Sequence, residues 1–145
     1  MIYLDASALV SLVTGRPYAV ELREFLAQSP EMPMGTSTIG FIETVRTLDR
    51  VGTYPTAMAD LLSAFTEILV TDEIRDWAAS LPGGVRTLDA IHIASAQAIG
   101  DELAFLVSYD KRMLDIAQSV GIRIAAPGMG REPHKDESIH LHGTR

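Results

Sequence analysis

Short apolar runs alternate along the chain with longer segments in which apolar residues recur every three to four positions. The short runs predict buried strands, and the periodic segments predict amphipathic helices. Glycine and proline separate them, as at Gly15, Pro17 and the Pro82–Gly84 loop. The predicted strands cover residues 2–4, 34–36, 67–70, 104–108 and 122–126, and the predicted helices cover residues 7–13, 18–28, 38–50, 55–65, 72–81, 87–99 and 111–120.

This order of elements predicts the fold class. Strands that alternate with helices favour a parallel sheet, because each parallel connection needs a crossover, usually a helix. We therefore expect an α/β domain of three layers, α/β/α, with a central parallel sheet flanked by helices. The domain is predicted to cover residues 1–127. Residues 128–145 are polar and without periodicity, and they are predicted to form a flexible tail.

Composition narrows the possible functions. The chain has 145 residues, no cysteine and a net charge of −7. The lack of cysteine excludes a disulfide scaffold, a thiol nucleophile and a Cys-ligated metal site. The acidic charge argues against long-range attraction to nucleic acid unless bound cations reverse it locally. No apolar run approaches the length of a membrane span, and the opening MIYLDASALV lacks a basic signal region, so we expect a soluble, cytoplasmic protein without membrane contact.

Four acidic residues stand out by their position relative to the predicted elements. Asp5 directly follows the first strand, and Asp110 follows the strand 104–108 after one residue. Asp89 lies in the first turn of the helix 87–99, and Glu43 lies in the helix 38–50. Ligands of parallel sheets bind outside the carboxyl ends of the strands, where Asp5 and Asp110 are expected.

The same residues also have purely structural interpretations. Asp5 and Asp110 can cap the helices behind them, and Asp89 can complement a helix dipole. Glu43 can form a surface ion pair with Arg46 or Arg50 on its own helix. The residue pattern alone leaves both interpretations open.

A family resemblance favours the functional interpretation. The segments LDASALV, STIGFIETVRTL, RTLDAIHIASA and VSYDKRM occur in one order along residues 1–127. Together they resemble the PIN-domain ribonucleases, and most of all the VapC toxins of VapBC toxin–antitoxin pairs. The resemblance implies a PIN-like domain with a Mg²⁺- or Mn²⁺-dependent ribonuclease site. Its acidic residues correspond here to Asp5, Glu43, Asp89 and Asp110.

The resemblance also assigns roles within this site. Asp5, Asp89 and Asp110 are expected to contact the metal, and Glu43 to hold it through water. Ser7 and Ser108 are expected to support the ligands. Carboxylate oxygens suit Mg²⁺, and the ion activates a water for attack on the RNA phosphate.

Further roles are predicted for the surroundings of the site. Arg86 and Arg112 are candidate substrate contacts. His92, between two isoleucines, is interpreted as a packed, hydrogen-bonded core residue. The expected partners are the RNA substrate, a cognate antitoxin protein and a second copy of the chain in a homodimer.

Three other functions were weighed. A phosphatase with an aspartyl intermediate needs a second acid two residues after Asp5, but the chain has Ser7 there. A receiver domain needs adjacent acids at the end of the first strand, but Tyr3 and Leu4 precede the single Asp5. A catalytically silent RNA- or protein-binding module with an acidic metal site remains the alternative.

Overall fold

A computed structural model describes residues 1–130 of the chain. Five short strands form one sheet in the order β3-β2-β1-β4-β5, and every neighbouring pair is parallel. The predicted central parallel sheet is therefore confirmed. Of the tail predicted over residues 128–145, only residues 128–130 lie within the described part. The strands are β1 Ile2–Leu4, β2 Met34–Ser37, β3 Thr66–Ile68, β4 Phe105–Val107 and β5 Ile124–Ala125.

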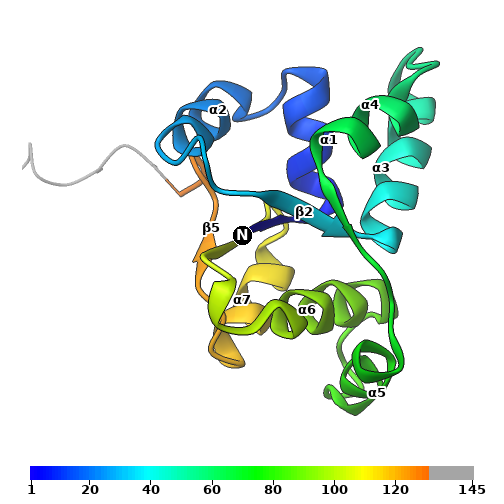
Figure 1. The fold of residues 1–145 in the computed structure, drawn as a ribbon, viewed down its shortest axis with the longest axis vertical. Helices are drawn as coiled ribbons and strands as arrows, with labels where there is room; N and C mark the ends of the chain where they lie inside the picture. The colour runs from blue at the N-terminus through cyan, green and yellow to red at the C-terminus, as the bar shows by residue number, and fades with distance from the viewer. Residues whose placement is uncertain (131–145) are drawn as a thin grey trace, which may run out of the picture.

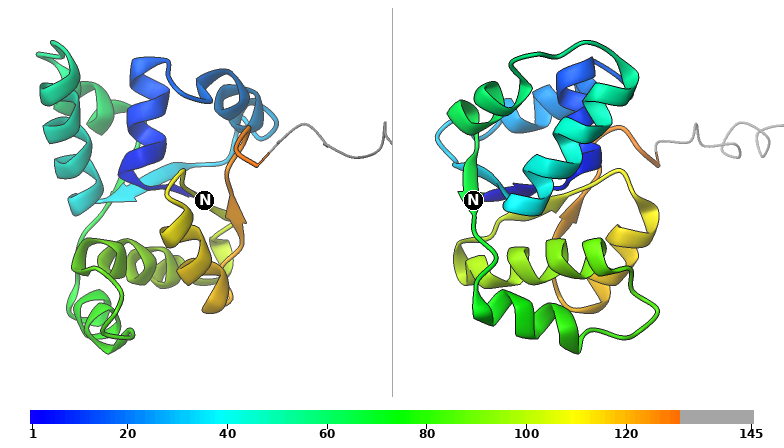
Figure 2. Two further views of the ribbon diagram at one scale, coloured as in Figure 1. Left: turned by 180° about the vertical axis from the view of Figure 1, so that it is seen from behind. Right: turned by 90° about the vertical axis from the view of Figure 1, so that its right-hand side faces the viewer.

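Helices cover both faces of this sheet, which makes the three predicted layers (Figure 1). One face carries α1 to α4, and the other carries α6 and α7, with α5 packed on the outer side of α6 (Figure 2). Within residues 1–130, no helix has the length and apolarity needed to span a membrane. The helices are α1 Ala6–Thr14, α2 Ala19–Ala27, α3 Thr38–Val51, α4 Ala57–Ala64, α5 Asp72–Ser80, α6 Thr87–Ile99 and α7 Lys111–Ser119, with a 3₁₀ turn, η1, at Gly100–Glu102.

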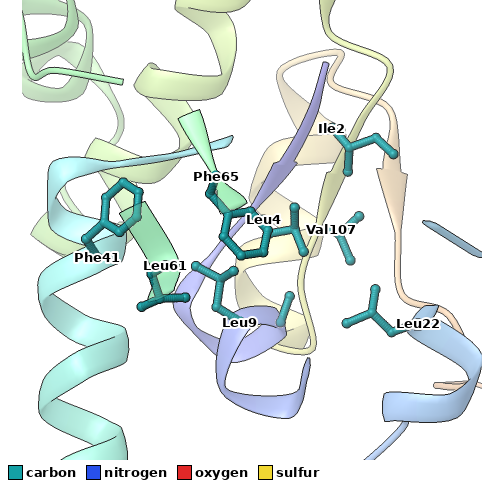
Figure 3. Close-up of a cluster of buried hydrophobic side chains, with 9 residues drawn as sticks. Ile2, Leu4, Leu9, Leu22, Phe41, Leu61, Phe65 and Val107 are labelled. Carbon is teal, nitrogen blue, oxygen red and sulfur yellow. The ribbon is translucent and has the colours of Figure 1, made fainter. Parts of the chain in front are cut away.

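The central strand β1 divides the core into two clusters. Ile2 and Leu4 point to the face covered by α1 to α4, where they pack with Leu9, Phe41 and other apolar side chains (Figure 3). Tyr3 points to the opposite face and packs against residues of α6 and α7. This alternation follows from the two-residue period of a strand. Because both faces are covered, a polar atom on β1 must find its partner inside the protein.

Two local predictions differ from the structure. Asp72 was expected to cap α5, but the Thr71 side chain accepts the Ile74 N–H and Asp72 is the first helical residue. Both residue types can cap a helix, and an acid in the first turn also suits the helix dipole. The strand predicted at 67–70 ends at Ile68, which pairs with Ser37, the last residue of β2. Strand β2 ends at Ser37, and Thr38 begins α3. Leu69 therefore has no residue of β2 to pair with.

The strand order reverses its direction between β1 and β4. From β1 the chain adds β2 and β3 on one side, then crosses to β4 on the other side of β1. Such a reversal of strand order is where open parallel sheets bind ligands, beyond the carboxyl ends of the strands. Leu4 pairs with Val107, so Asp5 and Ser108 leave these two strands side by side.

Candidate active site

Asp5 is fixed at the carboxyl end of β1 by hydrogen bonds to both carboxylate oxygens. It is the N-cap of α1, and its Oδ1 accepts the Ala8 N–H at 3.0 Å and the Ser7 hydroxyl at 2.6 Å. Its Oδ2 accepts the Ser108 hydroxyl at 2.5 Å. Only 3 % of Asp5 is exposed, and this burial raises the pKa of its carboxyl group, although His92 and the hydrogen bonds oppose the rise.

The two serines connect Asp5 with Asp110. Besides donating to Asp5, the Ser108 hydroxyl accepts the Asp110 N–H at 3.0 Å, and the Ser7 hydroxyl accepts the Tyr109 N–H at 2.9 Å. Asp110 is the N-cap of α7, where its Oδ1 accepts the Arg112 N–H at 3.0 Å. We call Asp5, Ser7, Ser108 and Asp110 the strand-end group. Its two acids are caps, as the structural interpretation predicted, and the two serines also link them at the same edge of the sheet.

Asp89 is the acid whose environment is least satisfied. It lies in the first turn of α6 and is 9 % exposed. Its Oδ2 is buried and has no hydrogen-bond partner among the described residues. Burial raises the pKa of the Asp89 carboxyl group, and the nearby charges of Asp110 and Glu43 raise it further, while His92 and Arg86 oppose the rise. These interactions show that Asp89, Asp110 and Glu43 share one electrostatic environment.

Glu43 reaches the same site from α3, where it meets His92 of α6. His92 Nε2 lies 2.9 Å from Glu43 Oε1, and His92 Nδ1 lies 2.6 Å from the Tyr3 hydroxyl oxygen. Within residues 1–130, neither Arg46 nor Arg50 forms an ion pair with Glu43. The interpretation of Glu43 as one end of a surface ion pair on its own helix is therefore wrong. We call Glu43, Asp89 and His92 the helix-borne group.

His92 supplies a positive charge within this largely acidic site. Burial lowers the pKa of its imidazole, but Tyr3, Glu43 and Asp5 outweigh burial and raise that pKa to about 10. Among these causes, the hydrogen bond to Glu43 and the charges of Glu43 and Asp5 favour the protonated ring. It is 2 % exposed, as expected for a packed and hydrogen-bonded core residue.

The two arginines predicted as substrate contacts are placed differently. Arg86 directly precedes α6, and its charge opposes the rise in the pKa of the Asp89 carboxyl group. Arg112 is exposed at the start of α7, and its backbone N–H is bound by Asp110. Among the described contacts, none joins the Arg112 side chain to the acids.

The donor set fits a hard divalent cation. Asp89 Oδ2 is a buried carboxylate oxygen that has no hydrogen-bond partner within residues 1–130, and the charges of neighbouring acids raise the pKa of this carboxyl group. A bound cation relieves such repulsion. In the part of the chain described here, no three His, Asp or Glu side chains form a ready-made metal cage. Mg²⁺ retains several waters and needs only one or two direct carboxylates, so an incomplete cage still suits it.

One polar residue of the site was not predicted from the sequence. Tyr3 was assigned only to a buried strand, yet its hydroxyl contacts His92 and accepts the Ser37 N–H at 3.3 Å. The signal that could have identified it is a tyrosine inside a fully buried strand, because a buried phenol normally needs a polar partner.

The chain is similar in sequence to proteins of a known family. Residues 2–118 match the family described as PIN domain. A relative from Mycobacterium tuberculosis (strain CDC 1551 / Oshkosh), named Ribonuclease VapC47, is 40 % identical over 136 residues, which cover 90 % of this chain and 100 % of the relative.

Solved structures share the fold at lower sequence identity. Mycobacterium tuberculosis VapC20, described as a sarcin–ricin loop cleaving toxin, has a TM-score of 0.67 at 18 % identity and covers 88 % of this chain and 100 % of its own. A toxin–antitoxin complex from Klebsiella pneumoniae has a TM-score of 0.67 at 22 % identity, over 88 % of this chain and 98 % of its own.

Proposed function

Because the chain belongs to the PIN-domain family, we propose that it is a metal-dependent endoribonuclease and the toxin of a toxin–antitoxin pair. The family membership and the α/β fold agree with the resemblance drawn from the sequence motifs. A relative named as a VapC ribonuclease, 40 % identical over nearly the whole chain, supports the ribonuclease activity.

The proposed cation is Mg²⁺, with Mn²⁺ as a substitute. Asp89, Asp5 and Asp110 are the residues that would hold it, with Glu43 acting through water. When bound, a divalent cation supplies Lewis-acid chemistry at the scissile phosphate and makes water acidic enough to attack at neutral pH.

The protein's own residues keep the carboxylates in place. Ser7 and Ser108 donate hydrogen bonds to both oxygens of Asp5, so its carboxylate plane has one orientation. His92 binds Glu43 through one oxygen of its carboxylate, Oε1. Arg86, whose charge acts on the Asp89 carboxylate, is the first proposed contact with a substrate phosphate, and Arg112 is the second.

The proposed partners follow from the relatives. Structures of this fold include a toxin–antitoxin complex, which supports a cognate antitoxin as the protein partner. The net charge of −7 suits a partner with a basic segment. A homodimer and a cytoplasmic location belong to the same proposal, as does the RNA substrate.

The observation that carries the proposal is the buried Oδ2 of Asp89, which has no hydrogen-bond partner among residues 1–130 and whose carboxyl group is affected by the charges of Asp110 and Glu43. Purified protein incubated with RNA should cleave it in Mg²⁺ or Mn²⁺ and stop in excess EDTA. Asp89→Asn should abolish cleavage and the metal-induced rise in melting temperature. Asp72→Asn, which changes an exposed acid on α5, is the matched control and should behave as wild type.

Two outcomes would contradict the proposal. Full cleavage in excess EDTA would require a mechanism without a metal. RNA that is retained by the protein in Mn²⁺ but never cut would favour the alternative of a catalytically silent binding module.

A further inference from the structure

The Tyr3 hydroxyl joins three of the elements that carry or precede acids of the site, namely β1, α3 and α6. Tyr3 belongs to β1, which ends at Asp5. Its hydroxyl oxygen accepts the N–H of Ser37, the N-cap of α3, and shares a hydrogen bond of 2.6 Å with His92 of α6. Helix α3 carries Glu43 and α6 carries Asp89. The Tyr3 hydroxyl thus connects β1 with α3 and α6.

This connection continues to a carboxylate. A carboxylate oxygen can only accept, so His92 Nε2 carries the proton that is donated to Glu43 Oε1 at 2.9 Å. The series of bonds therefore runs from the start of α3, through Tyr3 and His92, to a side chain six residues further along the same helix. The bond from the backbone N–H of Ser37 is the longest at 3.3 Å, and the two bonds of His92 are 2.6 and 2.9 Å. Tyr3 and His92 contribute rigid rings to the series, whereas Glu43 has a flexible side chain.

Burial separates the anchoring residues from solvent and from substrate. Tyr3 is 0 % exposed and His92 is 2 % exposed, whereas the Glu43 side chain is 30 % exposed. Neither ring can touch RNA or a hydrated cation, but the carboxylate they hold can. Tyr3 packs in one buried cluster with Ile93 and Leu106, and this packing restricts the movement of the phenol ring.

Glu43 needs such support because its own helix does not provide it. A glutamate has several rotatable bonds, and ordering it costs conformational entropy. Arg46 and Arg50 form no ion pair with it among the described residues. In sites that hold a cation, the groups behind the ligands fix their orientation, and removing such a group typically lowers activity or metal affinity by about 10- to 100-fold.

We propose that His92 and Tyr3 are positioning residues that hold the Glu43 carboxylate in its orientation toward the active site. This inference rests on the proposed ribonuclease function for its effect on catalysis. It assigns a function to a histidine that the sequence pattern places in the core. It also predicts that the phenol oxygen of Tyr3, though it touches no ligand, acts on the reaction through Glu43.

Tyr3→Phe is the decisive variant, because it removes one oxygen atom and retains the buried ring. We expect kcat for RNA cleavage to fall about 10-fold with little change in KM. In a Glu43→Gln background the same substitution should change kcat less than about twofold, because residues that act through one another are not additive. Ser95→Ala removes a buried hydroxyl of α6 that binds only its own helix backbone, and it should leave kcat unchanged.

A second measurement does not depend on activity. In metal-free protein, NMR of the histidine rings should show a His92 Nε2–H proton that exchanges slowly and whose chemical shift moves in both Tyr3→Phe and Glu43→Gln. An Nε2–H signal that is absent, or that is unchanged in Tyr3→Phe, would overturn the positioning role. Equal losses of kcat in the wild-type and Glu43→Gln backgrounds would also overturn it, because they would indicate a general structural effect.

The two proposals can fail separately. A wild-type protein that cleaves no RNA would contradict the ribonuclease function and the kinetic consequence of Tyr3→Phe. The NMR signal would still decide whether Tyr3 and His92 hold Glu43. Normal cleavage together with a Tyr3→Phe variant of wild-type kcat would refute the positioning role and leave the ribonuclease function intact.

Discussion

The strand-end group and the helix-borne group hold their carboxylates in different ways. In the strand-end group, both oxygens of Asp5 accept hydrogen bonds from serine hydroxyls or the backbone, and Asp110 accepts a backbone N–H. In the helix-borne group, Glu43 depends on one histidine, and Asp89 Oδ2 has no partner among the described residues. The acids of the strand-end group thus have hydrogen-bond donors within the protein. In the helix-borne group, by contrast, Asp89 is repelled by the charges of neighbouring acids.

This difference separates two tasks of an acidic residue. A carboxylate that caps a helix and accepts several donors stabilises the fold without a ligand. A buried carboxylate that faces other acids destabilises the folded protein until a cation neutralises it. Removal of an acid from each group should therefore affect activity alike and stability oppositely.

The largest expected effects come from Asp5→Ala and Asp89→Asn. Each should lower kcat for RNA cleavage by about 10²–10³-fold, the usual effect of removing one electrostatic contact in a transition state. In EDTA, Asp5→Ala should lower the free energy of unfolding by about 1–3 kcal/mol, because it removes a helix cap and leaves buried donors unpaired. Asp89→Asn should raise that free energy, since it removes a repelled charge. Urea denaturation measures both.

One result would contradict this difference between the strand-end group and the helix-borne group. If Asp89→Asn lowers the free energy of unfolding as much as Asp5→Ala does, then Asp89 has stabilising partners and the two groups do not differ in kind.

Gly40→Ala should disturb the helix-borne group through the backbone. A Cβ at position 40 would lie 1.9 Å from Thr36 Oγ1 and would also crowd the Thr36 Cβ and Cγ2 at 3.0 Å, so Thr36 or the first turn of α3 must shift. We expect a shift of α3 to displace Glu43. Such overpacking typically costs about 1–3 kcal/mol of stability. Thr36→Ala in the same chain should restore part of the loss. Gly83→Ala, whose Cβ meets open space, is the control for urea denaturation; a wild-type midpoint for Gly40→Ala would contradict the expected clash.

Ser108→Ala should lower kcat less than removal of an acid does, because it removes only a group that orients Asp5. The variant loses the hydroxyl that donates to Asp5 Oδ2 and accepts the Asp110 N–H. We expect kcat to fall about 10-fold, as is typical when a group that orients a ligand is removed. Ser119→Ala, which removes an exposed hydroxyl at the end of α7, should cleave RNA at the wild-type rate. Full activity in Ser108→Ala would show that Asp5 needs no support from β4.

Much of the strand-end group could be predicted from the sequence. Asp5 and Asp110 stand directly after apolar strands, and parallel strands bring their carboxyl ends to one edge, so proximity follows from local pattern and topology. The motif around Asp89 added the third acid through family resemblance. Local competition between neighbours was harder to predict, as with Thr71, which caps α5 in place of Asp72.

The contacts of the helix-borne group could not be predicted from the pattern. Glu43 and His92 are 49 positions apart, and their hydrogen bond depends on how α3 and α6 lie against each other. On its own helix, Glu43 has Arg46 and Arg50 within reach, so local spacing favoured a different partner. The hydroxyl of Tyr3 gave no periodic signal, because the ring alone satisfies the apolar pattern of β1.

The double use of Asp5 also bears on how relatives of this protein should be interpreted. Because its carboxylate begins α1, a descendant that has lost RNA cleavage would still be under selection to keep an aspartate there simply in order to fold. An aspartate at that position is therefore weak evidence that a homologue is active. Asp89 contributes no such benefit to folding, so its loss or retention in a lineage is the more informative sign of whether the chemistry has survived.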